Sequence, residues 1–176
     1  MDLFKDNLCL SLTILNFFLG HNTVKEQTLI IVKPDGVARG LTGEIISRLE
    51  RKGLKLVAGK FCSVSREKAE HHYAEHSSRP FFNSLLDFIT SSPVMILVVE
   101  GNTAIASVRN LVGKTNGVES APGTIRGDFG SSRSLNLIHA SDSAESAKKE
   151  IGNFFSPDEI VSYELPTQSW IFEADE

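Results

Sequence analysis

A histidine near the C-terminal end of the chain occupies a position that favours chemistry on phosphate. The segment Asn136-Leu137-Ile138-His139-Ala140-Ser141-Asp142-Ser143 predicts a short strand that ends at His139 and a helix that begins directly afterwards. We expect Ser141 or Asp142 to cap that helix. Backbone N–H groups at a helix N-terminus attract phosphate, and a neutral imidazole can attack phosphorus directly. The pattern indicates phosphoryl transfer through His139, although most histidines that end a strand are purely structural.

The stretch before this histidine contains groups suited to holding a diphosphate. Arg109 lies in a predicted helix, and Thr115 and Arg126 lie in the loop that follows. Two forked guanidinium groups and a hydroxyl match the oxygens of a diphosphate, whereas a single surface arginine usually forms only a solvated salt bridge. The segment Gly113-Lys114-Thr115 is not a P-loop, because Val108 occupies the position where that motif requires its first glycine.

A lysine follows the first predicted strand, in the turn Lys33-Pro34-Asp35-Gly36. Proline and glycine favour a tight turn, and the lysine ammonium group at such a position can reach a ribose hydroxyl or a phosphate. An ordinary exposed lysine in a turn is the alternative interpretation of this segment.

A zinc enzyme is a competing hypothesis. His72-Tyr73-Ala74-Glu75-His76 fits the H-x-x-E-H pattern of inverted zinc peptidases, in which the two histidines share one helical face. Glu150 would be the distant third ligand. Five-residue patterns also arise by chance, and the chain is short for such a peptidase, so stoichiometric zinc and chelator-sensitive proteolysis would be needed to support this hypothesis.

The elements that must position these groups follow an alternating order. Hydrophobic periodicity and turn residues predict strands at 29–32, 54–61, 94–99 and 135–138, and helices at 44–52, 66–76, 81–90, 102–112 and 143–155. Asn102 is expected to cap the fourth helix. Residues 113–134 have almost no periodicity, and an irregular stretch of this length in a compact domain is usually functional. The order predicts an α/β fold, a ferredoxin-like split βαβ sandwich with a four-stranded antiparallel sheet covered by helices.

Composition and termini restrict the class of protein. With 176 residues, 41% hydrophobic and 23% charged, the chain fits one globular domain, and its net charge of −4 argues against broad nucleic-acid binding. The apolar run Leu8–Leu19 is short for a membrane span and poor as a signal peptide. We therefore expect residues 1–26 to be an extension outside a domain at 27–176. Two cysteines without an export signal favour the cytoplasm, and Trp170, Ile171 and Phe172 are expected to pack as anchors.

Four motifs in this order and spacing closely resemble the nucleoside diphosphate kinase family. They are Lys33-Pro34-Asp35-Gly36-Val37, Arg79-Pro80-Phe81-Phe82, Pro122-Gly123-Thr124-Ile125-Arg126-Gly127-Asp128-Phe129 and the segment 136–143. The resemblance extends from about Thr28 to Trp170 and implies ping-pong transfer of the γ-phosphate of a nucleoside triphosphate, mainly ATP, to a nucleoside diphosphate. The sequence departs from the family pattern at Ala140, at Arg133-Ser134-Leu135 and at Gly117.

The resemblance also implies roles for individual residues. His139 would be the phosphorylated nucleophile, held by Glu150 with help from Ser141, while Tyr73 and Lys33 would lie beside the transferred phosphate. The nucleotide would be bound by residues that contact its ribose (Lys33, Asn136), its α- and β-phosphates (Arg109, Thr115, Arg126) and its base (Phe81, Leu85). Stacking on one face of the base reads no hydrogen-bond pattern, so base specificity should be broad.

Further expectations concern the metal and the assembly. Mg²⁺ would be held through the nucleotide phosphates and not by protein ligands. The expected partners are ATP, other nucleoside tri- and diphosphates and further copies of the chain in a hexamer or tetramer, with no specific nucleic acid and no membrane. A catalytically silent relative that acts by binding is an alternative, with the extension serving as a tether, but every residue assigned to the site is present.

Overall fold

A computed structural model describes residues 25–171 of the protein. Most of the predicted extension at 1–26 lies outside the described residues, as do Cys9 and Phe172. Residues 25–163 form one compact unit. The strands and helices predicted from the sequence lie within this unit. The proposed domain boundary between residues 26 and 27 stays a prediction.

The centre of this unit is a four-stranded antiparallel sheet. Its strands are β1 (Glu26–Val32), β2 (Lys55–Cys62), β3 (Val94–Gly101) and β4 (Ile138–Ala140). They lie in the order β2-β3-β1-β4, and each neighbouring pair is antiparallel. The order confirms the predicted ferredoxin-like α/β sandwich. Because β4 pairs only with β1, its other side is a free edge of the sheet within the described residues.

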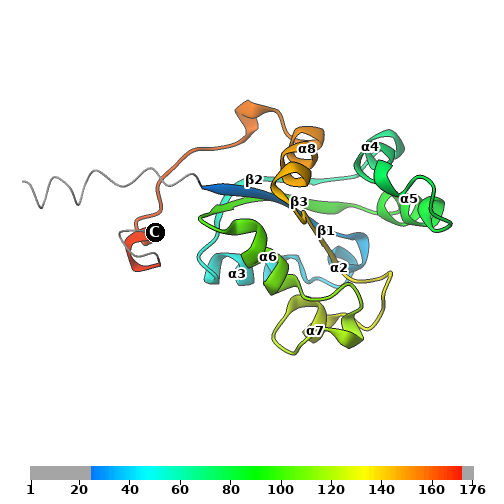
Figure 1. The fold of residues 1–176 in the computed structure, drawn as a ribbon, viewed down its shortest axis with the longest axis horizontal. Coiled ribbons are helices and arrows are strands. Elements are labelled where there is room, and N and C mark those ends of the chain that lie inside the picture. The colour runs from blue at the N-terminus through cyan, green and yellow to red at the C-terminus, as the bar shows by residue number, and fades with distance from the viewer. Residues whose placement is uncertain (1–24, 172–176) are drawn as a thin grey trace, which may run out of the picture. The chain divides into compact units, whose positions relative to one another are not determined.

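Helices cover both faces of the sheet (Figure 1). One layer contains α4 (Arg66–His72), α5 (Phe82–Thr90) and α8 (Ala144–Phe154), and the other contains α2 (Pro34–Ala38), α3 (Thr42–Arg51), α6 (Ala104–Val112) and α7 (Ile125–Phe129). Strand β1 contributes buried side chains to the packing against both helix layers, because alternate side chains of a strand point to opposite faces of the sheet. Leu29 and Ile31 are buried against the first layer, and Ile30 and Val32 are buried against the second. A strand buried on both faces explains its uninterrupted apolar sequence.

Two helices occur where the sequence predicts a turn or an irregular loop. Helix α2 begins at Pro34, which takes the first helical position, where a missing backbone N–H costs nothing. Helix α7 lies inside the stretch 113–134, and the side-chain oxygen of Thr124 caps it by accepting a hydrogen bond from the Gly127 N–H at 3.0 Å. Both helices have only five residues, which is too short for a periodic signal in the sequence.

The structure also corrects several predicted boundaries. The helix expected at 66–76 ends at His72 and is followed by a separate 3-10 helix, Ala74–His76. The last strand lies at 138–140 instead of 135–138, because Leu137 adopts a positive φ of 72° just before it. Ser143, not Ser141 or Asp142, caps α8 through a hydrogen bond from the Ser146 N–H. The residue that precedes α6 is Thr103, and not Asn102.

The segment after α8 is described as far as Ile171. Trp170 is 89% exposed and Ile171 is 39% exposed, and the expectation that they pack as anchors stays a prediction. They belong to residues 164–171, in which the structure describes one short 3-10 helix, Gln168–Trp170. Within the compact unit, the segment after α8 is bonded to β2: the Val161 N–H donates to the Val57 carbonyl and the Tyr163 hydroxyl donates to the Leu56 carbonyl, both at 2.8 Å.

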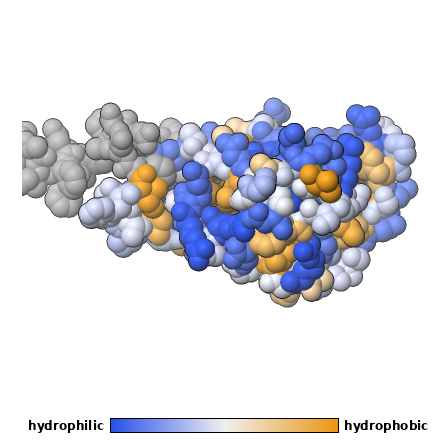
Figure 2. Space-filling model, turned by 90° about the horizontal axis from the view of Figure 1, so that it is seen from below, coloured by the Kyte–Doolittle hydropathy of each residue, from blue (hydrophilic) through white to orange (hydrophobic). Residues whose placement is uncertain are grey.

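Hydrophobicity was compared along the described helices and over the surface. Among residues 25–171, no helix combines the length and the apolar character needed to cross a bilayer. The face that carries α3, α6 and α7 is mostly hydrophilic, with separate hydrophobic patches (Figure 2).

Candidate active site

The edge strand β4 places His139 beside the layer of α4 and α8. His139 pairs with Ile31 of β1 in the sheet register, and its neighbours Ile138 and Ala140 are buried against the opposite layer. Side chains alternate along a strand, so the imidazole projects from the other face. Its side chain keeps 23% of its surface exposed, and a substrate can therefore reach the ring.

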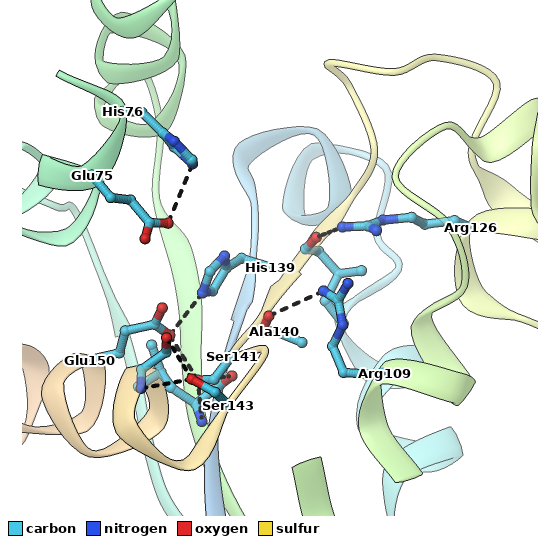
Figure 3. Close-up of polar contacts among 12 residues, drawn as sticks. Glu75, His76, Arg109, Arg126, His139, Ala140, Ser141, Ser143 and Glu150 are labelled. Carbon is cyan, nitrogen blue, oxygen red and sulfur yellow. Dashed lines mark hydrogen bonds and ion pairs between the residues drawn. The ribbon is translucent and has the colours of Figure 1, made fainter. Parts of the chain in front are cut away.

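A carboxylate orients this imidazole. His139 Nε2 lies 2.9 Å from Glu150 Oε2, and the same oxygen accepts a hydrogen bond from the Ser141 hydroxyl at 2.7 Å (Figure 3). Ser141 is fully buried and is also within hydrogen-bond distance of the backbone of Leu29. The three side chains are therefore tied to β1, β4 and α8 at once. The sequence assignment of Glu150 and Ser141 beside His139 agrees with this geometry.

Glu150 is ionised in this arrangement. Burial by itself would raise the pKa of its carboxyl group, but the hydrogen bond and electrostatic interaction with His139, together with the hydrogen bond from Ser141, outweigh burial and lower the pKa below its ordinary value. An ionised Glu150 accepts the proton on Nε2 as a hydrogen bond. This fixes the tautomer in which the other ring nitrogen, Nδ1, has the lone pair.

Aromatic rings enclose the other side of His139. Tyr73 is buried, with its ring centroid 6.2 Å from that of His139, and burial raises the pKa of its phenol. The His72 ring meets His139 edge to face at 4.6 Å. Burial, and secondly His139, lower the pKa of His72 to about 3. The sequence reasoning did not place His72 in this site; its position directly before Tyr73 was the available signal.

Two arginines bind the carbonyls on either side of the histidine. Arg126 Nη2 donates to the Ile138 carbonyl at 2.7 Å, and Arg109 Nη1 donates to the Ala140 carbonyl at 3.4 Å (Figure 3). These residues come from α7 and α6, so groups from the second helix layer reach around the edge strand. The two arginines that the sequence assigned to the phosphates therefore both contact the backbone of the histidine segment.

Arg126 also holds the loop before it. Its Nε donates to the Asn136 carbonyl and its Nη1 donates to the carbonyls of Gly113 and Lys114, at 3.2–3.3 Å. With the bond to Ile138, four of the five guanidinium N–H groups have backbone partners. Burial, and then the charge of Arg109, lower the pKa of Arg126 to about 10. Arg126 thus stabilises the loop through its hydrogen bonds and also provides positive charge.

Lys33 and Asn136 form a buried pair. The Lys33 ammonium group donates to the Asn136 side-chain oxygen, and the Asn136 amide donates to the carbonyls of Thr115 and Arg133 at 2.8 and 2.9 Å. Burial is the largest cause that lowers the pKa of Lys33 to about 8, against the opposing charge of Asp35. Asp35 in turn accepts a hydrogen bond from the Leu137 N–H at 3.0 Å. It supports the backbone of the histidine segment, a role that the sequence analysis did not assign.

A pocket of about 340 Å³ lies beside these cations, lined by Arg109, Lys114, Thr115, Asn116, Glu119 and Arg133. Two of the residues assigned to the diphosphate, Arg109 and Thr115, therefore share one cavity. Phe81 lies outside this lining and is 51% exposed. Its ring centroid is 5.7 Å from that of His76, which in turn stacks on Tyr73. Leu85 is partly buried against the core.

The structure does not support the H-x-x-E-H arrangement. Helix α4 ends at His72, so His72 and His76 do not share one face of a continuous helix. Within residues 25–171, His72 is grouped with His139 and Glu150 as a set that could hold a metal ion, and His76 is not in that set.

Fold and charge together define a class of enzyme. A ring nitrogen that can accept a phosphate lies beside buried cations that can neutralise it, on the edge of an α/β sandwich, and phosphoryl transfer requires mainly this kind of positioning and charge. The protein is a phosphotransferase. The family model "Nucleoside diphosphate kinase" matches residues 26–160, and the chain belongs to this family.

Individual relatives agree with the family model. The chain is 60% identical to a nucleoside diphosphate kinase of Archaeoglobus fulgidus, over 84% of this chain and 98% of the relative, and 55% identical to one of Staphylococcus carnosus, over 84% and 99%. A halophilic nucleoside diphosphate kinase of Halobacterium salinarum, solved in complex with CDP, superposes with a TM-score of 0.83 and 49% identity over 85% of this chain and 99% of that one. The family match confirms the predicted activity, transfer of the γ-phosphate of a nucleoside triphosphate to a nucleoside diphosphate.

Proposed function

We propose that His139 is the residue that carries the phosphate between the two nucleotides. The observation that supports this role is the 2.9 Å contact between Nε2 and Glu150, which leaves Nδ1 as the nucleophilic nitrogen. In the first half-reaction Nδ1 forms a bond to the γ-phosphorus while the bond from that phosphorus to the β-phosphate oxygen breaks. The nucleoside diphosphate leaves with the bonding electron pair. In the second half-reaction a terminal phosphate oxygen of another diphosphate attacks the same phosphorus and releases His139.

Glu150 and Ser141 stabilise the phosphorylated ring in this mechanism. When Nδ1 bonds to phosphorus the imidazole gains positive charge, and the nearby carboxylate at Nε2 offsets that charge. Ser141 keeps the carboxylate oxygen in place through its 2.7 Å hydrogen bond. The edge-to-face contact with buried Tyr73 would restrict rotation of the imidazole, and it supports a role for the phenol beside the transferred phosphate.

The cations bind the nucleotide phosphates in our proposal. Lys33 neutralises the transferred phosphate, and Arg109, Thr115 and the remaining N–H of Arg126 bind the α- and β-phosphates. The shared pocket of Arg109 and Thr115 supports this division. A forked guanidinium beside a hydroxyl can bind two phosphate oxygens at once.

The sugar and base contacts follow from the same arrangement. Lys33 and Asn136, which contact one another, would bind the ribose hydroxyls, and the exposed ring of Phe81 with Leu85 would stack on the base. Stacking does not select a particular base, so the enzyme should accept several nucleotides. The relative from Halobacterium salinarum in complex with CDP shows that a diphosphate nucleotide fits a protein of this family.

Kinase activity implies a divalent metal, and we propose that Mg²⁺ enters with the nucleotide. Mg²⁺ prefers six oxygen ligands, whereas the set of metal-binding groups found within residues 25–171 contains two histidines and one glutamate. The residues present therefore fit a metal that is held by phosphate oxygens, with Lys33 and the arginines sharing the remaining negative charge. Bound in this way, Mg²⁺ would reduce the charge of the phosphates.

We also propose a closed homo-oligomer, a hexamer or a tetramer, in the cytoplasm, with residues 27–176 as the catalytic domain. Support for association comes from exposed apolar side chains: Phe61 on the edge strand β2 is 64% exposed and Val118 in the loop is 75% exposed. Exposed apolar groups on a sheet edge favour pairing with another copy. Sedimentation of the purified chain would distinguish six copies, four copies and one.

Labelled phosphoenzyme tests the role of His139. Incubation with [γ-³²P]ATP and Mg²⁺, without an acceptor, should label the protein through an acid-labile, base-stable bond, and a nucleoside diphosphate should remove the label. Peptide mapping should locate it on His139. His139→Gln should lose both the label and the exchange of terminal phosphates, while His71→Gln, on the exposed side of α4, is the matched control. Label that persists in His139→Gln would contradict the proposal.

A further inference from the structure

A buried histidine, His72, lies beside the proposed nucleophile and has no assigned role. His72 is 8% exposed, and neither of its ring nitrogens has a hydrogen-bond partner within residues 25–171. Leaving a buried polar group without a partner costs free energy, so such a group calls for a ligand or another explanation. The ring lies edge to face with His139 at a centroid distance of 4.6 Å.

Three potential metal ligands meet at this point. One ligand atom each from His72, His139 and Glu150 lies within 4.8 Å of the other two. These residues come from α4, β4 and α8, so the tertiary structure, and not local sequence, brings them together. Two imidazoles and one carboxylate form a ligand set that is typical of zinc sites with an open fourth position.

We infer that His72, His139 and Glu150 form a binding site for Zn²⁺. Bond lengths of about 2.0–2.1 Å place tetrahedral ligand atoms about 3.3 Å apart. His139 Nε2 and Glu150 Oε2 are already 2.9 Å apart. The separations are at most 4.8 Å, so the longest must shorten by no more than about 1.5 Å, and rotation of the partly exposed His139 and Glu150 side chains toward the buried His72 ring can supply this movement.

The chemistry of the ligands selects the metal. Imidazole nitrogen binds Zn²⁺, Cu²⁺ and Ni²⁺ well, whereas Mg²⁺ and Ca²⁺ prefer oxygen ligands. The Mg²⁺ that accompanies the nucleotide therefore does not compete strongly for these groups. The exposed sides of His139 and Glu150, at 23% and 14%, are the route by which an ion enters from solvent.

Zinc in this site blocks the nucleophile, a consequence that rests on the proposed role of His139. Coordination uses the lone pair of Nε2, so the proton that Nε2 donates to Glu150 is released to solvent. Solvent returns one proton to Nδ1, and the ring that binds the metal is again a neutral imidazole. Nδ1 no longer has a free electron pair, so it does not attack phosphorus. The binding of zinc itself does not depend on that role.

Metal binding to the full-length protein without nucleotide tests the site. After equilibrium dialysis against Zn²⁺, metal analysis should find one equivalent more in the wild type than in His72→Phe, which preserves an aromatic ring in the aromatic surroundings. His71→Phe, an exposed neighbour on the same helix, is the matched control and should retain that equivalent. Equal zinc in all three proteins overturns the proposal. So does loss of the equivalent in His76→Gln with retention in His72→Phe.

A second measurement uses the wild-type protein, so it tests the site even if the His72→Phe variant does not fold. Wild-type crystals soaked in Zn²⁺ should give an anomalous difference peak at the zinc edge between His72, His139 and Glu150, and absence of this peak overturns the site. Zn²⁺ should also prevent phosphoenzyme formation in the wild type, a chelator should restore it, and His72→Phe should require at least about 10-fold more zinc for the same effect. Labelling without zinc is measured in parallel, so failure of the proposed function is recognised separately.

Discussion

His139 Nε2 and Glu150 Oε2 are 2.9 Å apart, although the two residues lie on different elements. The contact couples the edge strand β4 to the second turn of α8, and Ser141 extends it to the backbone of β1. Because β1 is buried on both faces, the imidazole is oriented from the centre of the sandwich. Supporting contacts of this kind hold a ring nitrogen in one orientation, from which it can attack a bound phosphate.

Removing the charge of Glu150 should slow the chemical step. In Glu150→Gln, we expect kcat to fall about 10- to 100-fold with little change in KM, since the carboxylate acts on the phosphorylated ring and not on the nucleotide. Steady-state kinetics with ATP and a second diphosphate measures both constants. Glu145→Gln, at an exposed position in the first turn of the same helix, is the control. A Glu150→Gln enzyme with changed KM and unchanged kcat would contradict this role.

Lys33 should limit activity at alkaline pH. Its pKa is lowered to about 8, so the ammonium group is charged below that pH and becomes neutral as the pH rises through it. The value of kcat/KM reports groups of the free enzyme, and it should decrease above about pH 8 as the phosphate loses its positive partner. In Lys33→Met, kcat/KM should be low and should no longer decrease there. Lys114→Met, in the neighbouring loop, should retain the decrease; its loss in that variant would assign the effect to Lys114.

The two arginines should differ in their effect on stability. Arg126→Ala removes four hydrogen bonds from buried or partly buried backbone carbonyls, and we expect the free energy of unfolding to fall by about 2–4 kcal/mol together with severe loss of activity. Arg109→Ala removes one long bond of 3.4 Å and should mainly raise KM. Chemical denaturation and kinetics on the same samples separate the two effects. Equal stability of the two variants would mean that the bonds of Arg126 contribute little.

A glycine in α7 should tolerate no side chain. A Cβ at Gly127 would lie 2.0 Å from the Ala121 carbonyl oxygen, so Gly127→Ala must displace the loop that Arg126 holds. We expect a loss of about 3 kcal/mol in the free energy of unfolding. Gly43→Ala is the control, because nothing lies within 4 Å of its Cβ position in α3, and alanine there should increase stability by up to about 1 kcal/mol. Thermal unfolding of both variants checks the contrast.

Local sequence was sufficient for the elements with strong patterns. The β-branched runs in β1 and β3 and the amphipathic helices α3, α6 and α8 lie where periodicity predicts them, because burial on one or two faces imposes a direct pattern on the chain. The short helices α2 and α7 were missed, since five residues contain too few turns to show a pattern. The end of α4 at His72 was also missed, and with it the reason why His72 and His76 do not act together.

The types and spacing of residues thus determined the family and the α/β class, and they indicated the residues that we propose accept and neutralise a phosphate. Only the tertiary structure decided which groups touch. His72 and His139 are 67 positions apart in the sequence, and nothing local to either one predicts their edge-to-face contact. The same holds for the bond from Arg126 to the Ile138 carbonyl, which forms only because the intervening loop folds back. The physical reason is that burial and hydrogen bonding across a sheet edge are properties of packed layers, and no local stretch of sequence records the layer against which it will pack.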